Sequence, residues 1–123
     1  MSAPRVLVYV QHLLGSGHLR RAALLSEAMV RAGLDVTLVS GGLPVPELRA
    51  TGVRLVQLAP VAAADMRFKS LVDAQGRAVD ASFQDARRDH LLAVFDEVRP
   101  QALVIELFPF GRRQMRFELL PPL

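Results

Sequence analysis

The sequence predicts an α/β fold, with a parallel sheet that carries helices on both faces. Apolar runs of strand length alternate with longer segments of helical periodicity, and this alternation is typical of parallel sheets. The first run, Val6 to Val10, is apolar without a break, as expected of a strand buried on both faces. The expected strands are residues 5–10, 36–40, 53–58 and 102–105, and the expected helices are residues 18–32, 46–51, 82–99 and 112–120.

The first helix has a clear inward face and a clear stop. Gly33 follows its last periodic residue and is a typical helix end. The inward face is expected to carry Ala22, Leu25, Met29 and Ala32.

Proline and serine mark the limits of the later helices. The short helix begins at Pro46 and ends before Gly52, while the longer one has Ser82 as its expected N-cap and stops at Pro100. Between residues 60 and 80 we expect a long loop with one helical turn, and long loops in compact domains are often functional lids. The expected inward residues of the longer helix are Leu91, Val94, Phe95 and Val98.

The order of the strands follows from the handedness of their connections. Right-handed crossovers allow the spatial order 3-2-1-4, which puts the topological switch point between the first and fourth strands. Ligands bind outside the carboxyl ends of strands at such a point. The loops 11–17 and 106–111 would both lie there, so we expect Glu106 beside the loop 11–17.

The fourth strand is expected at an edge of this sheet. Its residues Leu103, Val104 and Ile105 are those of a strand buried on both faces, yet no further strand follows. A buried strand left at a sheet edge is an aggregation hazard. We therefore expect the chain to be the front part of a larger protein, or to pair with another chain.

The composition places the chain among soluble single domains. It has 123 residues, 51% of them hydrophobic and 22% charged, and no stretch long enough to span a membrane. The absence of cysteine excludes disulfides and thiolate metal sites, and it fits a cytoplasmic location. The net charge is +3, with basic residues scattered among 12 acidic ones, so no nucleic acid partner is expected and membrane contact is at most peripheral.

A glycine-rich turn joins the first strand to the first helix. Residues 15–21 read Gly-Ser-Gly-His-Leu-Arg-Arg, and the start of a helix presents unpaired N–H groups and a partial positive charge. Arg20 stands where a dinucleotide fingerprint needs its third glycine, and Ser40 stands where its acidic residue would be. The turn therefore suits an anionic or hydroxyl-bearing ligand other than NAD.

Within this turn, His18 is a candidate general base. It can take a proton from a hydroxyl group or from water near neutral pH. Arg21 lies three residues on, on the same helical face, where it could hold a phosphate or carboxylate. Arg20 could do the same or lie on a solvated face.

The remaining polar candidates are less specific. Glu106 could orient His18 or hold a sugar hydroxyl, or it could form an ion pair with Arg112 or Arg113. His12 is a weaker candidate in the same loop as the glycines, and His90 is expected on the surface. The three histidines lack the spacing of a metal site, so no metal is expected.

Three stretches resemble a known group of enzymes. Residues 8–21 resemble the first loop of GT-B glycosyltransferases related to MurG, in which a strand leads into a glycine-rich loop that ends Gly-His. Residues 40–42 and 106–118 resemble a less studied branch of predicted glycosyltransferases. The Gly-His-x-x-Arg element is also similar to the nucleotide-sugar hydrolase of pseudaminic acid synthesis.

This resemblance implies the N-terminal, acceptor-side half of an enzyme with two Rossmann-like domains. Such enzymes move a sugar from a nucleotide-sugar donor to a sugar or lipid-linked acceptor, without a further cofactor. By this analogy His18 is the base, and a second Rossmann-like domain or another copy of the chain covers the sheet edge. Because the donor domain is absent, little activity is expected of the chain alone; the alternatives are a hydrolase fragment and a non-catalytic binding module. The implied binding residues are Gly15, Ser16, Gly17, Arg21 and Glu106, with His12, Arg20, Gly41, Gly42 and Arg112 as weaker candidates.

Overall fold

A four-stranded parallel sheet forms the centre of the molecule. The computed structural model describes residues 3–13, 16–63, 71–106 and 118. The strands of the sheet follow the spatial order β3-β2-β1-β6, and all three neighbouring pairs are parallel. The predicted order 3-2-1-4 is therefore confirmed. Their bounds are Arg5–Val10 for β1, Asp35–Ser40 for β2, Arg54–Gln57 for β3 and Ala102–Ile105 for β6.

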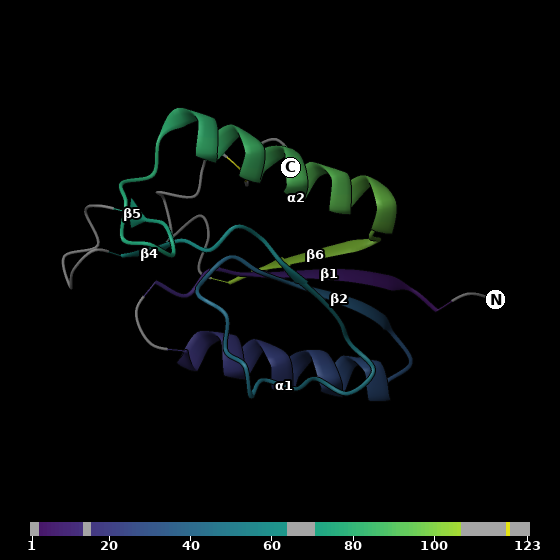
Figure 1. The fold of residues 1–123 in the computed structure, drawn as a ribbon. Coiled ribbons are helices and arrows are strands. Elements are labelled where there is room, and N and C mark those ends of the chain that lie inside the picture. The colour runs from purple at the N-terminus through teal and green to yellow at the C-terminus, as the bar shows by residue number, and fades with distance from the viewer. Residues whose placement is uncertain (1–2, 14–15, 64–70, 107–117, 119–123) are drawn as a thin grey trace.

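The two long helices cover opposite faces of this sheet, α1 (Gly17–Arg31) below it and α2 (Ala81–Val98) above it in Figure 1. Alternate residues of β1 point to opposite faces of the sheet. Val6 and Val8 accordingly pack in the core on the α1 side, whereas Leu7 and Tyr9 pack on the α2 side. The uninterrupted apolar run of β1 thus serves two cores.

The segment between β2 and β3 contains no helix, so the expected helix at 46–51 is wrong. Its regular features are two turns, in which the N–H of Leu48 donates to the carbonyl of Val45 at 3.0 Å and the N–H of Val53 donates to that of Ala50 at 3.1 Å. Leu48 and Val45 both pack against the apolar core on the α1 side. A single helical turn would form few internal hydrogen bonds, and the segment makes this packing instead.

The expected loop at 60–80 contains a small hairpin. Ala62–Ala63 (β4) and Leu71–Val72 (β5) pair antiparallel. A turn follows at Gly76, whose φ of 80° favours glycine. The two strands have only two residues each and pair at two positions. They are too short to produce an alternating apolar pattern in the sequence.

Both long helices differ from expectation in one detail. The N-cap of α2 is Asp80 rather than Ser82, because the Asp80 carboxylate accepts a hydrogen bond from the N–H of Phe83 at 2.8 Å. In α1, Leu25 is 50% exposed, and Ala32, which follows the last helical residue, is also exposed, so the expected places of both in the core are wrong. The buried stripe runs through Leu19, Ala22, Ala23 and Ser26 instead.

The edge strand β6 is covered on one face only. Leu103 and Ile105 pack in the α2-side core, whereas Val104 points to the other face and is 38% exposed. Burial on both faces was expected and is not found among the described residues, because α1 packs over β1 and β2. The expected turn at 108–111 lies outside the described residues, as does the expected helix at 112–120 except for Glu118.

A charged network is buried between α2 and the ends of the strands. The guanidinium of Arg87, in α2, is fully buried and forms a two-pronged pair with the Glu118 carboxylate. The distances are 2.6 Å from Nε to Oε2 and 3.0 Å from Nη2 to Oε1. Nη1 donates to the carbonyls of Gly41 at 2.9 Å and Ala59 at 2.8 Å. One side chain therefore ties α2 to the segments that follow β2 and β3.

Two residues of the first strand region complete this network. The hydroxyl of Tyr9 donates to Oε1 of Glu118, and the side-chain oxygen of Gln11 accepts from Nη2 of Arg87. Burial raises the pKa of Tyr9 well above its usual value, and the negative charge of Glu118 raises it further. The phenol is therefore a firm donor at neutral pH.

The network predicts a strong dependence of stability on Glu118. Replacing Glu118→Gln removes the negative charge and leaves Arg87 buried without its counter-ion, which should lower the free energy of unfolding by about 3–5 kcal/mol. Urea denaturation measures this change. Arg88→Ala is the control, because Arg88 pairs only with the exposed acids Asp85 and Asp89 and should change stability by less than about 1 kcal/mol. Equal effects of the two substitutions would contradict the buried pair.

Candidate functional site

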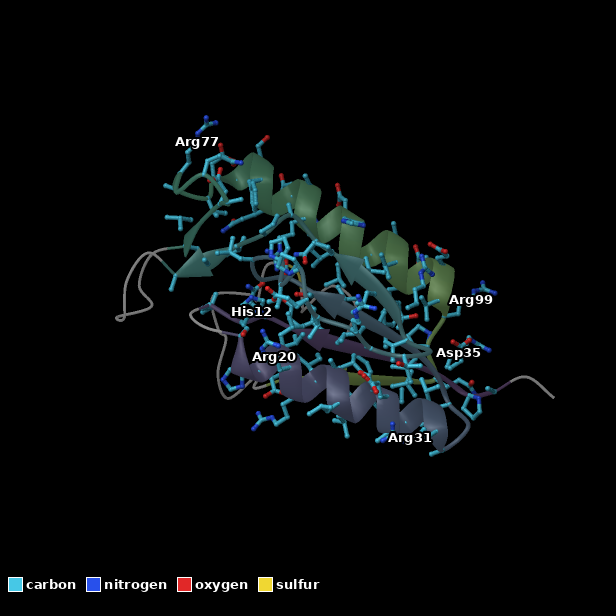
Figure 2. All side chains as sticks on the ribbon, turned by 60° about the horizontal axis from the view of Figure 1, so that its bottom comes forward. His12, Arg20, Arg31, Asp35, Arg77 and Arg99 are labelled. Carbon is cyan, nitrogen blue, oxygen red and sulfur yellow. The ribbon has the colours of Figure 1, made fainter. Side chains whose placement is uncertain are left out.

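The candidate site lies at the carboxyl edge of the parallel sheet. Figure 2 shows His12, which follows β1, at the same end of the molecule as Arg20 in the first turns of α1. Arg31, Asp35 and Arg99 lie at the opposite end. The direction of the strands therefore places the start of α1 at the sheet edge where parallel α/β proteins bind ligands.

His18, Arg21 and Glu106 meet at this edge. Nδ1 of His18 lies 3.0 Å from Oε1 of Glu106, and Nη2 of Arg21 donates to the same oxygen. His18 belongs to α1, and Glu106 directly follows β6, where its backbone N–H bonds to the carbonyl of Tyr9 at 3.1 Å. The expected neighbourhood of His18 and Glu106 is thus confirmed.

The contact with Glu106 sets the proton position on His18. An ionised carboxylate only accepts hydrogen bonds, so Nδ1 carries the proton that it shares with Glu106. Nη2 of Arg21 lies 3.3 Å from Nδ1 of His18. Because both nitrogens then carry a hydrogen, this approach is a contact and not a hydrogen bond. Nε2 is then the basic nitrogen of the neutral ring. The His18 side chain is 38% exposed, so solvent and small ligands reach it.

Glu106 is held as a carboxylate. Its side chain is only 19% exposed, and burial by itself would raise its pKa. The hydrogen bonds from Arg21 and His18 outweigh this effect, together with the positive charge of Arg21, and lower the pKa of Glu106 below its usual value. The carboxylate thus accepts hydrogen bonds from both Arg21 and His18.

The start of α1 is open to an anion. Its N-cap, Ser16, forms no side-chain capping hydrogen bond, and the first turn contains no acidic residue. The Ser16 hydroxyl instead accepts from Nε of Arg20 at 3.1 Å. A Cβ on Gly17 would meet no atom of the described residues within 4 Å. The first turns of α1 thus combine helix N–H groups with two nearby cations, Arg20 and Arg21, of which Arg21 is already paired with Glu106.

Close packing explains the residues found at Gly41, Gly42 and His12. A Cβ on Gly41 would overlap Arg87 and Gln11, and a Cβ on Gly42 would overlap the His12 ring. His12 is buried, and its Nε2 lies 2.9 Å from the carbonyl oxygen of Leu43. Gly15 and Arg112, also expected at the site, lie outside the described residues.

Sequence reasoning missed the buried cluster of Arg87, Gln11 and Glu118. The available signal was spacing: Arg87 precedes Leu91 by four residues and Val94 by seven, which puts it on the apolar stripe of α2. A charged residue on such a stripe must find a buried partner. Nothing in the sequence shows that this partner is Glu118.

Metal sites and membrane spans are both absent from the described residues. No cluster of three or more histidine, aspartate or glutamate side chains is placed to hold a metal ion in that part of the chain. Neither of the helices seen there is long and apolar enough to cross a membrane.

Comparison with solved structures identifies the fold. No protein-family model and no curated protein matches the chain. It is similar to UGT2 of Phytolacca americana in complex with UDP-2fluoro-glucose and pterostilbene, with a TM-score of 0.54 and 18% identity over 94% of this chain and 28% of that chain. The apo form of UGT2 gives a TM-score of 0.55 and 19% identity over 95% and 27%.

These similarities show the fold alone. The chain has the Rossmann-like α/β architecture found in part of a GT-B UDP-glycosyltransferase. It spans only 28% of the length of the UGT2 chain in the complex.

Two glycines should respond differently to the same substitution. Gly17→Ala adds a methyl group in open space at the start of a helix, so stability should stay equal or rise by up to about 1 kcal/mol. Gly42→Ala places the methyl group against His12 and should cost about 1–3 kcal/mol. Thermal unfolding of both variants checks this; a destabilised Gly17→Ala would mean that the space beside Gly17 is filled.

The lowered pKa of Glu106 predicts a pH-dependent contribution to stability. A carboxyl group whose pKa is lowered on folding stabilises the native state above its unfolded pKa, and this contribution is lost as the pH falls through the folded value. Glu106→Gln should therefore cost about 1 kcal/mol at pH 7. The difference from wild type should shrink below pH 4.5, the unperturbed value.

Urea denaturation of both proteins between pH 3 and pH 7 measures this difference. Glu97→Gln is the control, because Glu97 is 63% exposed in its pair with Arg54 and should change stability little at any pH. A cost of Glu106→Gln that stays constant down to pH 3 would contradict the lowered pKa.

Proposed function

We propose that the chain is the N-terminal, acceptor-side domain of a glycosyltransferase of the MurG-like kind. It would move a sugar from a nucleotide-sugar donor to an acceptor hydroxyl. One observation carries the proposal: Nδ1 of His18 lies 3.0 Å from the Glu106 carboxylate at the carboxyl edge of the sheet, and we infer from this contact that Nε2 is the basic nitrogen. The shared fold with part of UGT2, which was solved with a nucleotide sugar bound, supports it.

His18 would act as the general base. Nε2 takes the proton from the acceptor hydroxyl as its oxygen bonds to the anomeric carbon of the donor sugar. The bond between that carbon and the nucleotide diphosphate breaks, and the diphosphate leaves with the bonding electrons. Glu106 then stabilises the imidazolium through Nδ1. A base that is held and electrostatically supported in this way fits transfer to a hydroxyl.

The cations and the helix start would face the negative charge of the donor. Arg21 and Arg20 lie in the first turns of α1, next to helix N–H groups that favour anions. Gly15, Ser16 and Gly17 would let the backbone approach the diphosphate or the acceptor. Arg112, Gly41, Gly42 and His12 would contribute less directly.

The rest of the active site would come from elsewhere. We propose that a second Rossmann-like domain, or another copy of the chain, binds the donor nucleotide, so that this chain alone has little activity. The exposed Val104 on the edge strand β6 is a surface that such a partner could cover. The proposed setting is cytoplasmic, with membrane contact that is at most peripheral.

A nucleotide-sugar hydrolase is the second candidate. The 38% exposure of His18 favours it, because water reaches the ring as readily as a sugar hydroxyl does. In this case water takes the place of the acceptor and the products are a free sugar and a nucleotide. The third possibility is a non-catalytic binding module. It predicts that replacing His18 does not change any turnover measured for the full-length protein.

The test is replacement of His18 in the full-length protein. His18→Ala should reduce kcat/KM for consumption of a nucleotide sugar by about 100- to 10,000-fold, because a general base contributes that much. Product analysis by mass spectrometry distinguishes a glycoside, expected for transfer, from a free sugar, expected for hydrolysis.

His90→Ala is the matched control, because His90 lies on the exposed surface of α2. It should retain full activity. If His18→Ala also retained activity while remaining folded by circular dichroism, the assignment of the base would be wrong.

A further inference from the structure

A pocket lies on the α1 side of the sheet, and its lining includes neither His18 nor Glu106. It is a cavity of about 170 Å³ between the first turns of α1, the ends of β2 and β3, and the segment around Val45 and Leu48. Its walls are mainly apolar, and none of its described lining residues is charged. It contains two side chains that can form hydrogen bonds, Ser40 and Gln57.

Ser40 is the informative residue of this pocket. It is the last residue of β2 and is only 5% exposed. Within the described part of the chain, its Oγ has no hydrogen-bond partner. Leu38, two residues earlier, packs in the α1-side core, so the strand alternation directs Ser40 to the same face as the pocket. A buried hydroxyl without a partner costs about 1–3 kcal/mol, so a ligand that supplies the partner recovers this energy.

Gln57 stands opposite Ser40 in the sheet, at the end of β3. Its amide nitrogen donates to the carbonyls of Gly42 at 2.7 Å, Leu58 at 2.8 Å and Ser40 at 3.2 Å. These bonds fix the carboxamide in one orientation and commit its nitrogen to the protein. Its side-chain oxygen can act as an acceptor, and Gln57 belongs to the lining of the pocket.

The size and lining of the pocket define its ligand. An engineered cavity of about 150 Å³ with apolar walls holds a benzene molecule, so this pocket suits a ring of that size. The absence of charge among the described lining residues disfavours carboxylates and ammonium groups, whose desolvation would not be compensated. A hydroxyl on the ring can accept from Ser40 and donate to the Gln57 oxygen.

We propose that this pocket binds a small, neutral ring compound that carries one hydroxyl group, with Ser40 as the residue that recognises the hydroxyl. The inference goes beyond the proposed function, because it needs neither His18 nor a sugar donor. Leu55, 45% exposed on β3, and Leu48 form the apolar walls against which the ring packs.

Phenol is the probe for this site. Titration of the protein with phenol, followed through the Leu and Val methyl signals in carbon–proton NMR spectra, should shift Leu55 and Val45 by the ring current. A ligand of this size should bind with a dissociation constant on the order of 1 mM. Toluene, which lacks the hydroxyl, should bind more weakly, and benzoate should produce no shift at these methyls.

Ser40→Ala isolates the role of the hydroxyl. The variant removes a buried group without a described partner, so it should fold at least as stably as wild type. Its affinity for phenol should fall roughly 3- to 10-fold, while its affinity for toluene should stay equal or rise. Ser26→Ala is the matched control, because Ser26 is another buried serine without a described partner and lies in α1 outside this lining.

A blocking variant and two contrary outcomes complete the test. Leu55→Phe should fill the pocket and abolish the methyl shifts with phenol. Equal phenol affinity in wild type and Ser40→Ala would overturn the proposal, as would shifts that avoid the pocket methyls. Because no step involves His18 or turnover, failure here leaves the glycosyltransferase proposal untouched, and loss of activity in His18→Ala says nothing about phenol binding.

Discussion

The buried ion pair of Arg87 and Glu118 is the interaction on which the carboxyl edge of the sheet depends. Both side chains are fully removed from solvent, and neither charge would be tolerated there alone. Arg87 and Glu118 form hydrogen bonds with each other and with the side chains of Gln11 and Tyr9. The guanidinium also donates to the carbonyls of Gly41 and Ala59. A buried charge pair of this kind fixes the arrangement of the chain more than it adds stability. Its hydrogen bonds to backbone carbonyls hold those positions in place.

The fixed positions lie in the segments that follow β1, β2 and β3, at the same edge of the sheet as the candidate site. The side chain of Gln11 donates to the carbonyls of His12 and Val61, both at 2.9 Å, and so ties the segment after β1 to the segment after β3. Gln57 holds the backbone after β2 in the same way. The segments that follow β1, β2 and β3 at the carboxyl edge are thus held together by side-chain amides and one guanidinium. Preorganised support of this kind is what a site needs for precise placement of reacting groups.

The sequence determined the fold to the extent that its signals were local or topological. The apolar runs, together with the handedness of their connections, were enough to place β6 beside β1, and this order alone brought His18 to Glu106. The sequence did not reveal the pairing of Arg87 with Glu118, because the partners are 31 residues apart and no periodicity links them. The position of Leu25 was predicted wrongly because apolar character alone does not determine which face of a helix packs on the sheet. The smaller residues Ala23 and Ser26 are buried there and allow α1 to approach the sheet closely. The prediction of a short helix at 46–51 was wrong for a related reason. The packing of Val45 and Leu48 against the core outweighed the weak helix propensity of the segment.

The span of these contacts along the chain has a consequence for biosynthesis. His18 and Glu106 are 88 residues apart, and Tyr9 and Glu118 are 109 apart. The first strand and first helix leave the ribosome long before either partner has been made, so during translation the imidazole and the start of α1 face solvent without their carboxylate. Closing such long loops carries an entropic cost that is recovered only when the last contacts form. The contact of His18 with Glu106 therefore cannot form before residue 106 has been synthesised, and Arg87 cannot be neutralised by Glu118 before residue 118 has been added.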